Sequence, residues 1–130
     1  MATEGAQPLK SSFIAGGDLS AKQYCFVKLS ADKTVVVCAG ATDVPVGVLQ
    51  NNPVSGQTAE VCVIGETKVS GDADLDYGML IGTSADGQAD RKIPGTDTTE
   101  YVVGVVKTGN TAAGGVVTAF VNCASPARAV

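Results

Sequence analysis

Short runs of valine and other β-branched residues recur along the chain, and glycine, proline, asparagine or aspartate separates each run from the next. No window keeps the period of about 3.6 residues that an amphipathic helix requires. The 16 glycines and 5 prolines among 130 residues suit strands that are joined by tight turns. This pattern predicts an all-β domain of about nine short strands, arranged as a sandwich or a barrel.

The expected strands are Tyr24–Leu29, Thr34–Cys38, Val46–Gln50, Ala59–Ile64, Glu66–Val69, Met79–Ile81, Gln88–Lys92, Tyr101–Val106 and Val116–Val121. Gly65 separates two of these runs, which indicates a bend or bulge. The positions of the apolar residues within the runs predict a buried core of Phe26, Val36, Val48, Val61, Val63, Leu80, Val103, Val105 and Val117.

Two halves of the chain resemble each other. Val46-Gly47-Val48 recurs as Val103-Gly104-Val105, and Ser30-Ala31-Asp32 recurs as Ser84-Ala85-Asp86. The first pair is separated by 57 positions (Gly47 to Gly104) and the second by 54 (Asp32 to Asp86), as loops of different length would produce. We therefore expect pseudo-repeats at about 18–64 and 74–122 within a single β domain of residues 17–124. The repeated glycines should lie where backbones bend or approach closely.

The two ends of the chain lack the strand pattern of the domain. Residues 1–16 are polar, small and aperiodic, and they are interpreted as an extended N-terminal arm. Residues 125–130 form a C-terminal tail. Within the arm, Pro8 suits an extended segment and Phe13-Ile14 is an apolar pair that would be unusual if fully exposed. One reading is a frayed terminus, and the other is an arm that becomes ordered on a partner surface, with Pro8, Leu9, Phe13 and Ile14 as the contact residues.

Charge argues against several partners. The chain has 9 Lys plus Arg against 13 Asp plus Glu, for a net charge of −4. Binding to nucleic acid or to an anionic membrane surface requires clustered cations, and the sequence has no basic run. The N-terminus lacks a signal-peptide pattern and no stretch is long and apolar enough to span a bilayer, so synthesis and residence in the cytoplasm are expected.

Catalytic and metal-binding patterns are weak. The sequence has no histidine, which excludes Ser/His/Asp and Cys/His nucleophile systems, so no enzyme activity is expected. Neither a cofactor nor a metal is predicted, because the acidic run at Asp72, Asp74 and Asp76 reads best as a solvated turn. The four cysteines lie in valine-rich runs and are interpreted as small apolar fillers; an opportunistic disulfide is the alternative, with Cys25–Cys38 as the best pair.

One enzyme family needs comparison. Residues 15–21 look a little like the first motif of trimeric dUTPases, and residues 74–78 look a little like their third. The second motif, of Arg-Ser-Ser type, and the C-terminal phosphate-covering motif are missing. Without these motifs no residues would hold or cover the nucleotide phosphates. A dUTPase-like enzyme is therefore the least favoured of three functional hypotheses, and the other two follow.

The order of several segments resembles tailed-bacteriophage capsid cement, or head decoration, proteins. The segments are residues 17–30, residues 43–51 with a Pro-x-Gly-Val strand, residues 56–63 and residues 101–106. The resemblance spans nearly the whole domain but rests on structural rather than catalytic motifs. It implies a small β-barrel or β-tulip-like fold on the outside of an assembled capsid.

The same resemblance implies how the protein would act. It would bind the major capsid protein and stabilise contacts between capsomers, as part of the virion exterior after synthesis in the host cytoplasm. A homotrimer on the shell is expected, with a dimer as the alternative. The second functional reading is a different phage or bacterial β-type binding module, such as a tail, fibre or adhesin domain.

Overall fold

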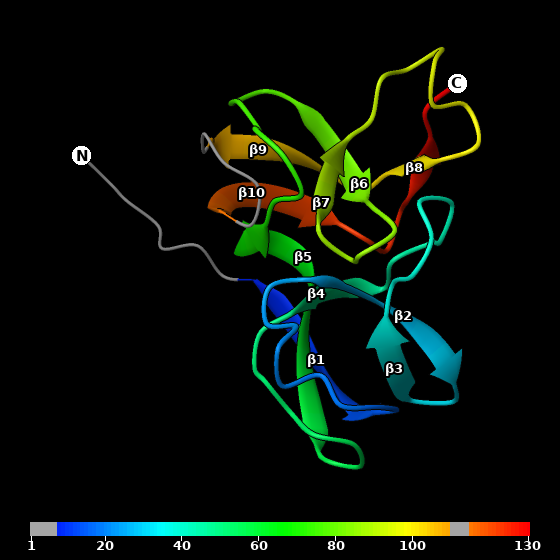
Figure 1. Ribbon diagram of the computed structural model, residues 1–130, viewed down its shortest axis with the longest axis vertical. Helices are drawn as coiled ribbons and strands as arrows, with labels where there is room; N and C mark the ends of the chain where they lie inside the picture. Colours follow the sequence, from blue (N-terminus) through cyan, green and yellow to red (C-terminus); the bar gives the residue numbers. More distant parts are fainter. Residues whose placement is uncertain (1–7, 110–114) are drawn as a thin grey trace.

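The computed structural model describes residues 8–109 and 115–130, and these residues form eleven strands and no helix (Figure 1). The all-β prediction is therefore confirmed. The strands are β1 (Leu9–Ala15), β2 (Phe26–Ala31), β3 (Thr34–Val37), β4 (Gly47–Leu49), β5 (Thr58–Ser70), β6 (Leu80–Thr83), β7 (Ala89–Arg91), β8 (Tyr101–Val102), β9 (Gly104–Thr108), β10 (Val116–Asn122) and β11 (Ala127–Arg128).

The first five strands form a small closed barrel. Their order is β1-β3-β2-β4-β5, and β1 also pairs with β5, which closes the ring. All pairings are antiparallel except that between β1 and β3. Full closure leaves this part of the sheet without an edge, so its backbone groups are paired within the ring. This barrel confirms the prediction of a small β-barrel fold.

The remaining strands form a second lobe with the same order of pairing. Strand β7 pairs with β6, β6 with β9, β9 with β10, and β10 with the second half of β5. Gly71, directly after β5, makes a parallel bridge to Ala89 of β7, as Ala15 of β1 does to Val35 of β3. Figure 1 shows the two lobes one above the other, with β5 passing from the lower into the upper. We call residues 9–64 unit one and residues 65–122 unit two.

The registers of the two units correspond residue by residue. Val27 pairs with Val37 and Gly47, and the residue 54 positions later, Ile81, pairs with Arg91 and Gly104. The offset grows to 58 by the last strand, where Val117 of β10 occupies the place of Ala59 of β5. The local sequence likeness of the two halves therefore coincides with equivalent strand pairing.

Strand β5 belongs to both units and bends between them. It pairs with β1 over Thr58–Ile64 and with β10 over Ile64–Ser70. Gly65 stands at this change of partner with φ of 132°, a conformation that favours glycine. The bend expected at Gly65 from the sequence is thus the junction of the two units.

The repeated glycines lie at the start of equivalent strands, at a close approach of two backbones. A Cβ on Gly47 would lie 2.5 Å from the carbonyl oxygen of Cys62, and one on Gly104 would lie 2.6 Å from that of Phe120. Cys62 and Phe120 are themselves equivalent residues of β5 and β10. The Val-Gly-Val repeat therefore marks the same contact in each unit.

Most of the predicted core is buried, with informative exceptions. Phe26, Val48, Val61, Val103 and Val117 are buried as expected. Val36, Val63 and Val105 are half-buried, and Leu80 is exposed over 37% of its surface, which contradicts its prediction. Side chains alternate between the two faces of a strand, and Leu80 and Val105 point away from the interior of their lobe.

The structure corrects the prediction for both chain ends. Residues 9–15 of the predicted arm are not unpaired, because β1 pairs with β3 on one side and β5 on the other. Residues 1–7 lie outside the described residues. In the predicted tail of residues 125–130, β11 pairs with β8 and the side chain of Ala129 is buried. No helix in the described ranges is long and apolar enough to cross a membrane.

Candidate interaction surfaces

The four contact residues predicted for the arm lie along β1 and next to its start. Leu9 and Ile14 are exposed over 56% and 48% of their surface. Phe13 is half-buried and packs against the core of unit one. Pro8 is half-buried beside Gly65, where an added Cβ would lie 2.7 Å from the Pro8 Cα. Leu9 and Ile14 are thus available to a partner, whereas Phe13 mainly supports the barrel.

A second apolar surface lies on unit two and was not singled out from the sequence. It is an open groove of about 420 Å³ on the outer side of β6, β9 and β10, with the β8–β11 ribbon alongside. Its lining consists of Leu80, Val102, Val103, Gly104, Val105, Phe120, Val121, Asn122, Ser125 and Ala127. No signal in the sequence reveals it, because the repeat makes Leu80 and Phe120 equivalent to Phe26 and Cys62, which are buried in unit one.

The groove is suited to contact rather than chemistry. None of the side chains that line it is an acid, a base or a thiol. Phe120 is exposed over 47% of its surface, and the Lys107 ammonium lies 5.6 Å from the centre of its ring. Glu66 pairs with Lys107, so a charged rim borders an apolar floor. An apolar centre with a polar rim is the usual composition of a protein–protein interface.

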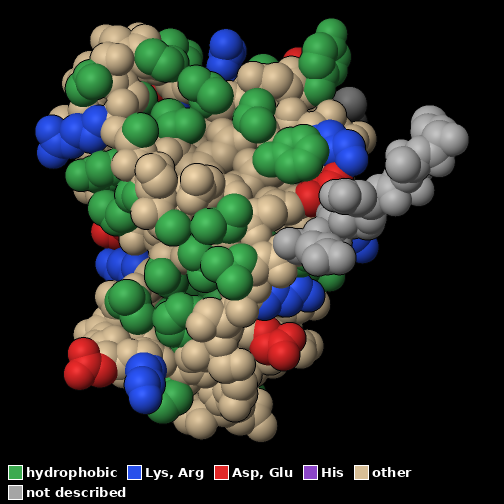
Figure 2. Space-filling view, turned by 180° about the vertical axis from the view of Figure 1, so that it is seen from behind, with side chains coloured by type: hydrophobic (Ala, Val, Ile, Leu, Met, Phe, Trp, Pro, Cys, Tyr) green, Lys and Arg blue, Asp and Glu red, His purple; other side chains and the backbone are tan. Residues whose placement is uncertain are grey.

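Exposed hydrophobic side chains are spread beyond the groove. Figure 2 shows hydrophobic side chains gathered over the centre and upper half of one face, with charged side chains mainly towards its edges. The large exposed apolar residues are Leu9, Ile14, Leu29, Val44, Val54, Ile64, Tyr77, Leu80, Ile93, Val116, Phe120 and Val130.

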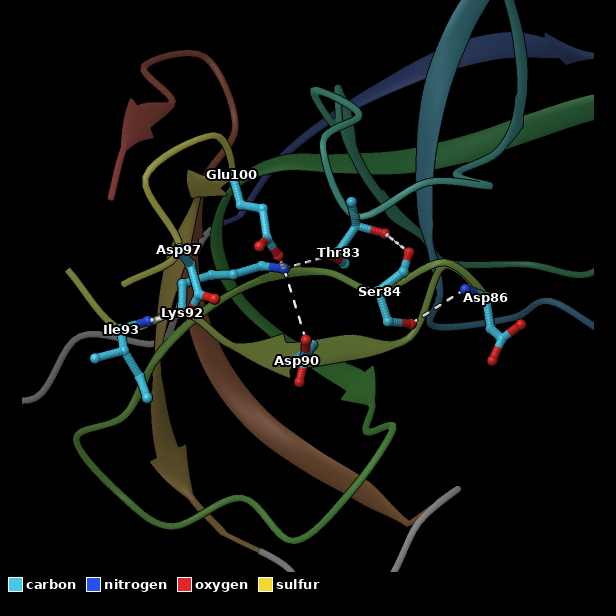
Figure 3. Close-up of polar contacts among 8 residues, drawn as sticks. All are labelled: Thr83, Ser84, Asp86, Asp90, Lys92, Ile93, Asp97 and Glu100. Carbon is cyan, nitrogen blue, oxygen red and sulfur yellow. Dashed lines mark hydrogen bonds and ion pairs between the residues drawn. The ribbon is translucent and has the colours of Figure 1, made fainter. Parts of the chain in front are cut away.

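One buried charge stands apart from these surfaces. The Lys92 side chain is fully buried, and its ammonium donates to the Thr83 carbonyl at 2.8 Å and to the Glu100 carboxylate (Figure 3). The Asp90 carboxylate is 3.7 Å away. Two hydrogen bonds and one longer ion pair thus compensate the buried ammonium. The cluster ties the loop after β7 to β6. Sequence analysis placed Lys92 at the end of the expected strand Gln88–Lys92 and did not predict its burial.

The loops around this cluster are equivalent in the two units. The Asp97 carboxylate accepts the N–H of Ile93 at 2.6 Å, just as the Asp43 carboxylate accepts that of Ala39 at 2.9 Å. Lys28 also donates to Asp43, and this hydrogen bond lowers the pKa of the Asp43 carboxyl below its ordinary value. These contacts hold the two equivalent loops in place, and none of them directs a reactive side chain into the groove of unit two.

The four cysteines are free and buried. Burial raises the pKa of every one of the four thiols, and it raises those of Cys38 and Cys123 to about 12. A thiol with so high a pKa is neither a nucleophile nor a metal ligand near neutral pH. In the described ranges, no three His, Cys, Asp or Glu side chains are grouped so that they could hold a metal ion.

We expect the native protein to resist thiol reagents at pH 8 and to show four reactive thiols after unfolding. With a pKa of about 12, roughly one Cys38 thiol in ten thousand is ionised at pH 8. The measurement is titration with a chromogenic disulfide reagent, with and without guanidinium. A count of two thiols in the unfolded protein would instead reveal a disulfide such as Cys25–Cys38.

Comparison with known proteins gives a structural relative only. No protein-family model matches the sequence, and no curated protein matches it significantly. Among solved structures, the fold is similar to that of the N base of head fibre gp8.5 in bacteriophage phi29, with a TM-score of 0.61. The match covers 90% of this chain and 96% of that one at 18% sequence identity. At this identity the likeness establishes a shared fold of two β units.

Proposed function

We propose that the chain is a structural protein of a bacteriophage virion, which binds the outer surface of the assembled capsid and stabilises contacts between capsomers. The observation that carries this proposal is the likeness of the whole fold to the base of a phage head fibre. The exposed apolar surfaces on β1 and on the groove of unit two support it, because they offer contact area without reactive groups. The net charge of −4 suits a protein partner rather than a nucleic acid.

In this proposal the partner is the major capsid protein, and Leu9 and Ile14 contribute to the contact. Both residues lie on β1, whose backbone is already paired on two sides. The contact therefore rests on exposed side chains rather than on addition of a strand to a free edge. Phe13 and Pro8 act by holding β1 in place. Self-association on the shell, as a trimer or a dimer, belongs to the same proposal.

A second candidate is the base domain of a fibre, and the structural relative favours it because that protein is the N base of a head fibre. The two candidates differ in what the chain does for the shell. A cement protein raises the resistance of the head to heat, whereas a fibre base occupies the head and leaves that resistance unchanged. Enzyme activity is not part of either proposal.

The test is binding to phage heads that lack this protein, from the phage that encodes the chain. We expect the pure protein to sediment with expanded heads at a fixed ratio and to raise the temperature at which they release DNA. Leu9→Glu and Ile14→Glu should each weaken this binding about tenfold or more, because a charge would be buried against the partner. Val44→Glu is the matched control, because Val44 is also exposed but lies in the loop between β3 and β4.

Two results would contradict the proposal. Absence of sedimentation with heads would exclude a capsid-binding role. Unchanged binding by both β1 variants would exclude Leu9 and Ile14 from the contact and leave the groove as the binding surface. Binding without a change in DNA release would favour the fibre base.

A further inference from the structure

The negative charge of the chain belongs to one of its two units. Unit one has four acids and four bases, so its side-chain charges cancel. Unit two has eight acids and four bases, and Glu4 and Arg128, which lie outside both units, cancel each other. The whole net charge of −4 is therefore carried by unit two.

The acids of unit two gather in two loops, residues 71–79 and residues 93–100. These loops hold five of its eight acids, and neither loop contains a base. The five are Asp72, Asp74, Asp76, Asp97 and Glu100. Asp74 and Asp76 are exposed. Figure 1 shows both loops in the upper lobe, so this end of the molecule presents carboxylates to water.

Three segments meet at the other end of the molecule, in unit one. The Ile14 N–H at the end of β1 donates to the Lys33 carbonyl in the β2–β3 turn at 2.7 Å. The Ala15 N–H donates to the Gln57 carbonyl in the loop before β5 at 2.9 Å. Figure 1 shows the end of β1, this turn and this loop at the lower end of the molecule. We call residues 14–15, 29–34 and 53–57 the tip of unit one.

The tip of unit one differs from the acidic end in both charge and exposed apolar surface. Ile14, Leu29 and Val54 are exposed over 48%, 53% and 45% of their surface. The charged residues of the tip are Asp32 and Lys33, one acid and one base in the same turn. The tip therefore combines three exposed aliphatic side chains with no net charge.

We propose that the tip of unit one docks on the outer face of the major capsid protein, so that the acidic loops of unit two point away from the shell. This inference rests on the proposed function and adds which end of the molecule makes the contact. It adds Leu29 and Val54 to Ile14 as contact residues. Leu9, roughly 17 Å from Ile14 by the rise of an extended strand, lies at the margin of the contact.

The cost of removing charges from water decides between the two ends. A carboxylate that is buried in an interface without a cation loses its hydration and gains no partner. Aliphatic side chains such as Leu29 and Val54 are instead stabilised when a partner removes them from water. The centres of protein–protein interfaces are accordingly depleted in charged residues. The tip fits such a centre, and the loops that carry Asp74 and Asp76 do not.

Thiol labelling on bound heads tests this orientation. The four native cysteines are buried, so one added surface cysteine is the site that reacts with a maleimide. Val54→Cys places a thiol in the tip, and Ile93→Cys places one in unit two at a nearly equal exposure of 45% against 43%. The two free variants should react at similar rates. On heads, the thiol from Val54→Cys should react roughly tenfold more slowly or less, and that from Ile93→Cys at its free rate.

Binding of charged variants gives a second measurement. Leu29→Glu and Val54→Glu should each weaken binding to heads about tenfold or more, because the added carboxylate would be buried against the partner. Ile93→Glu adds the same charge in unit two and should bind as the unaltered chain does. Circular dichroism of each variant checks that both units remain folded.

Other outcomes overturn the inference, and they differ from failure of the proposed function. If the chain binds heads but the thiol from Ile93→Cys is protected, alone or together with that from Val54→Cys, unit two takes part in the contact and the orientation is wrong. If the thiol from Val54→Cys already reacts slowly in concentrated free protein, a second copy covers the tip instead of the shell. If the unaltered chain does not bind heads at all, the proposed function and this inference fail together.

Discussion

Removal of residues 9–15 is expected to abolish the cooperative unfolding transition of the whole domain. Strand β1 pairs with β3 and with β5, and without it the barrel of unit one opens along two strands. Ala15 and Phe13 would leave the core cluster that contains Val27, Val35 and Val61. The free-energy cost of open strand edges and newly exposed valines would be comparable with the whole stability of a domain, which is about 5–15 kcal/mol.

The loss should extend to unit two. Phe26, Val48 and Cys62 of unit one pack with the core of unit two, and β5 runs through both units. Unfolding of unit one would expose that part of the core, so one transition is expected for both units. Thermal melting followed by circular dichroism measures the effect.

The matched control removes residues 2–7 only, which leaves β1 complete. We expect its melting temperature to stay within a few degrees of that of the full chain. A shift of this size corresponds to a change in unfolding free energy of less than about 1 kcal/mol. A normal melting transition after removal of residues 9–15 would show that β1 is dispensable. In that case residues 9–15 would behave as the extended arm that the sequence predicts and not as a strand that the barrel requires.

The reason why β1 was not predicted lies in its side chains. The sequence Leu9-Lys-Ser-Ser-Phe-Ile-Ala15 buries Ala15 fully and Phe13 in part, and the other five residues are exposed. A strand with so little buried surface carries almost no alternation, and alternation is the signal that sequence analysis uses. Its stability comes from pairing on both sides, which depends on strands that follow later in the chain.

The sequence repeat predicts the pairing of the strands but not the burial of their side chains. Val-Gly-Val and Ser-Ala-Asp indicated two similar halves. The structure pairs the Val-Gly-Val segments in equivalent registers and places Ser-Ala-Asp at equivalent turns, between β2 and β3 and between β6 and β7. The sequence could not show that Phe26 is buried and the equivalent Leu80 is exposed, because both are apolar strand residues. Burial there depends on how the units pack, and not on any property of either strand. The groove was missed for this reason.

Loss of the Lys92 charge cluster is expected to cost about 3–5 kcal/mol of unfolding free energy when Lys92→Ala removes the side chain. The substitution leaves the Thr83 carbonyl and the Glu100 carboxylate without their donor and opens a cavity where the buried lysine stem lay. Lys92→Met keeps most of the volume and should cost less. Urea unfolding at neutral pH measures both effects.

A double-mutant cycle measures the interaction between Lys92 and its partner Glu100. Glu100→Gln weakens the strongest acceptor of a fully buried ammonium, and Asp90, at 3.7 Å and more exposed, replaces it only in part. Lys92→Met combined with Glu100→Gln should cost less than the sum of the single changes, by about 1–3 kcal/mol. Additive effects would mean that the two side chains do not act on each other.

An exposed ion pair of the same chain is the matched control for this cycle. Lys107 pairs with Glu66, but half of the Lys107 side chain is exposed. Lys107→Met should therefore change the unfolding free energy by only about 0–1 kcal/mol, because water already solvates that charge. Both lysines pair with a glutamate, and they differ in burial and in the additional contacts of Lys92 with the Thr83 carbonyl and Asp90. Lys92 corresponds to the buried Cys38 of unit one, and its contacts fasten the longer loop of unit two to β6.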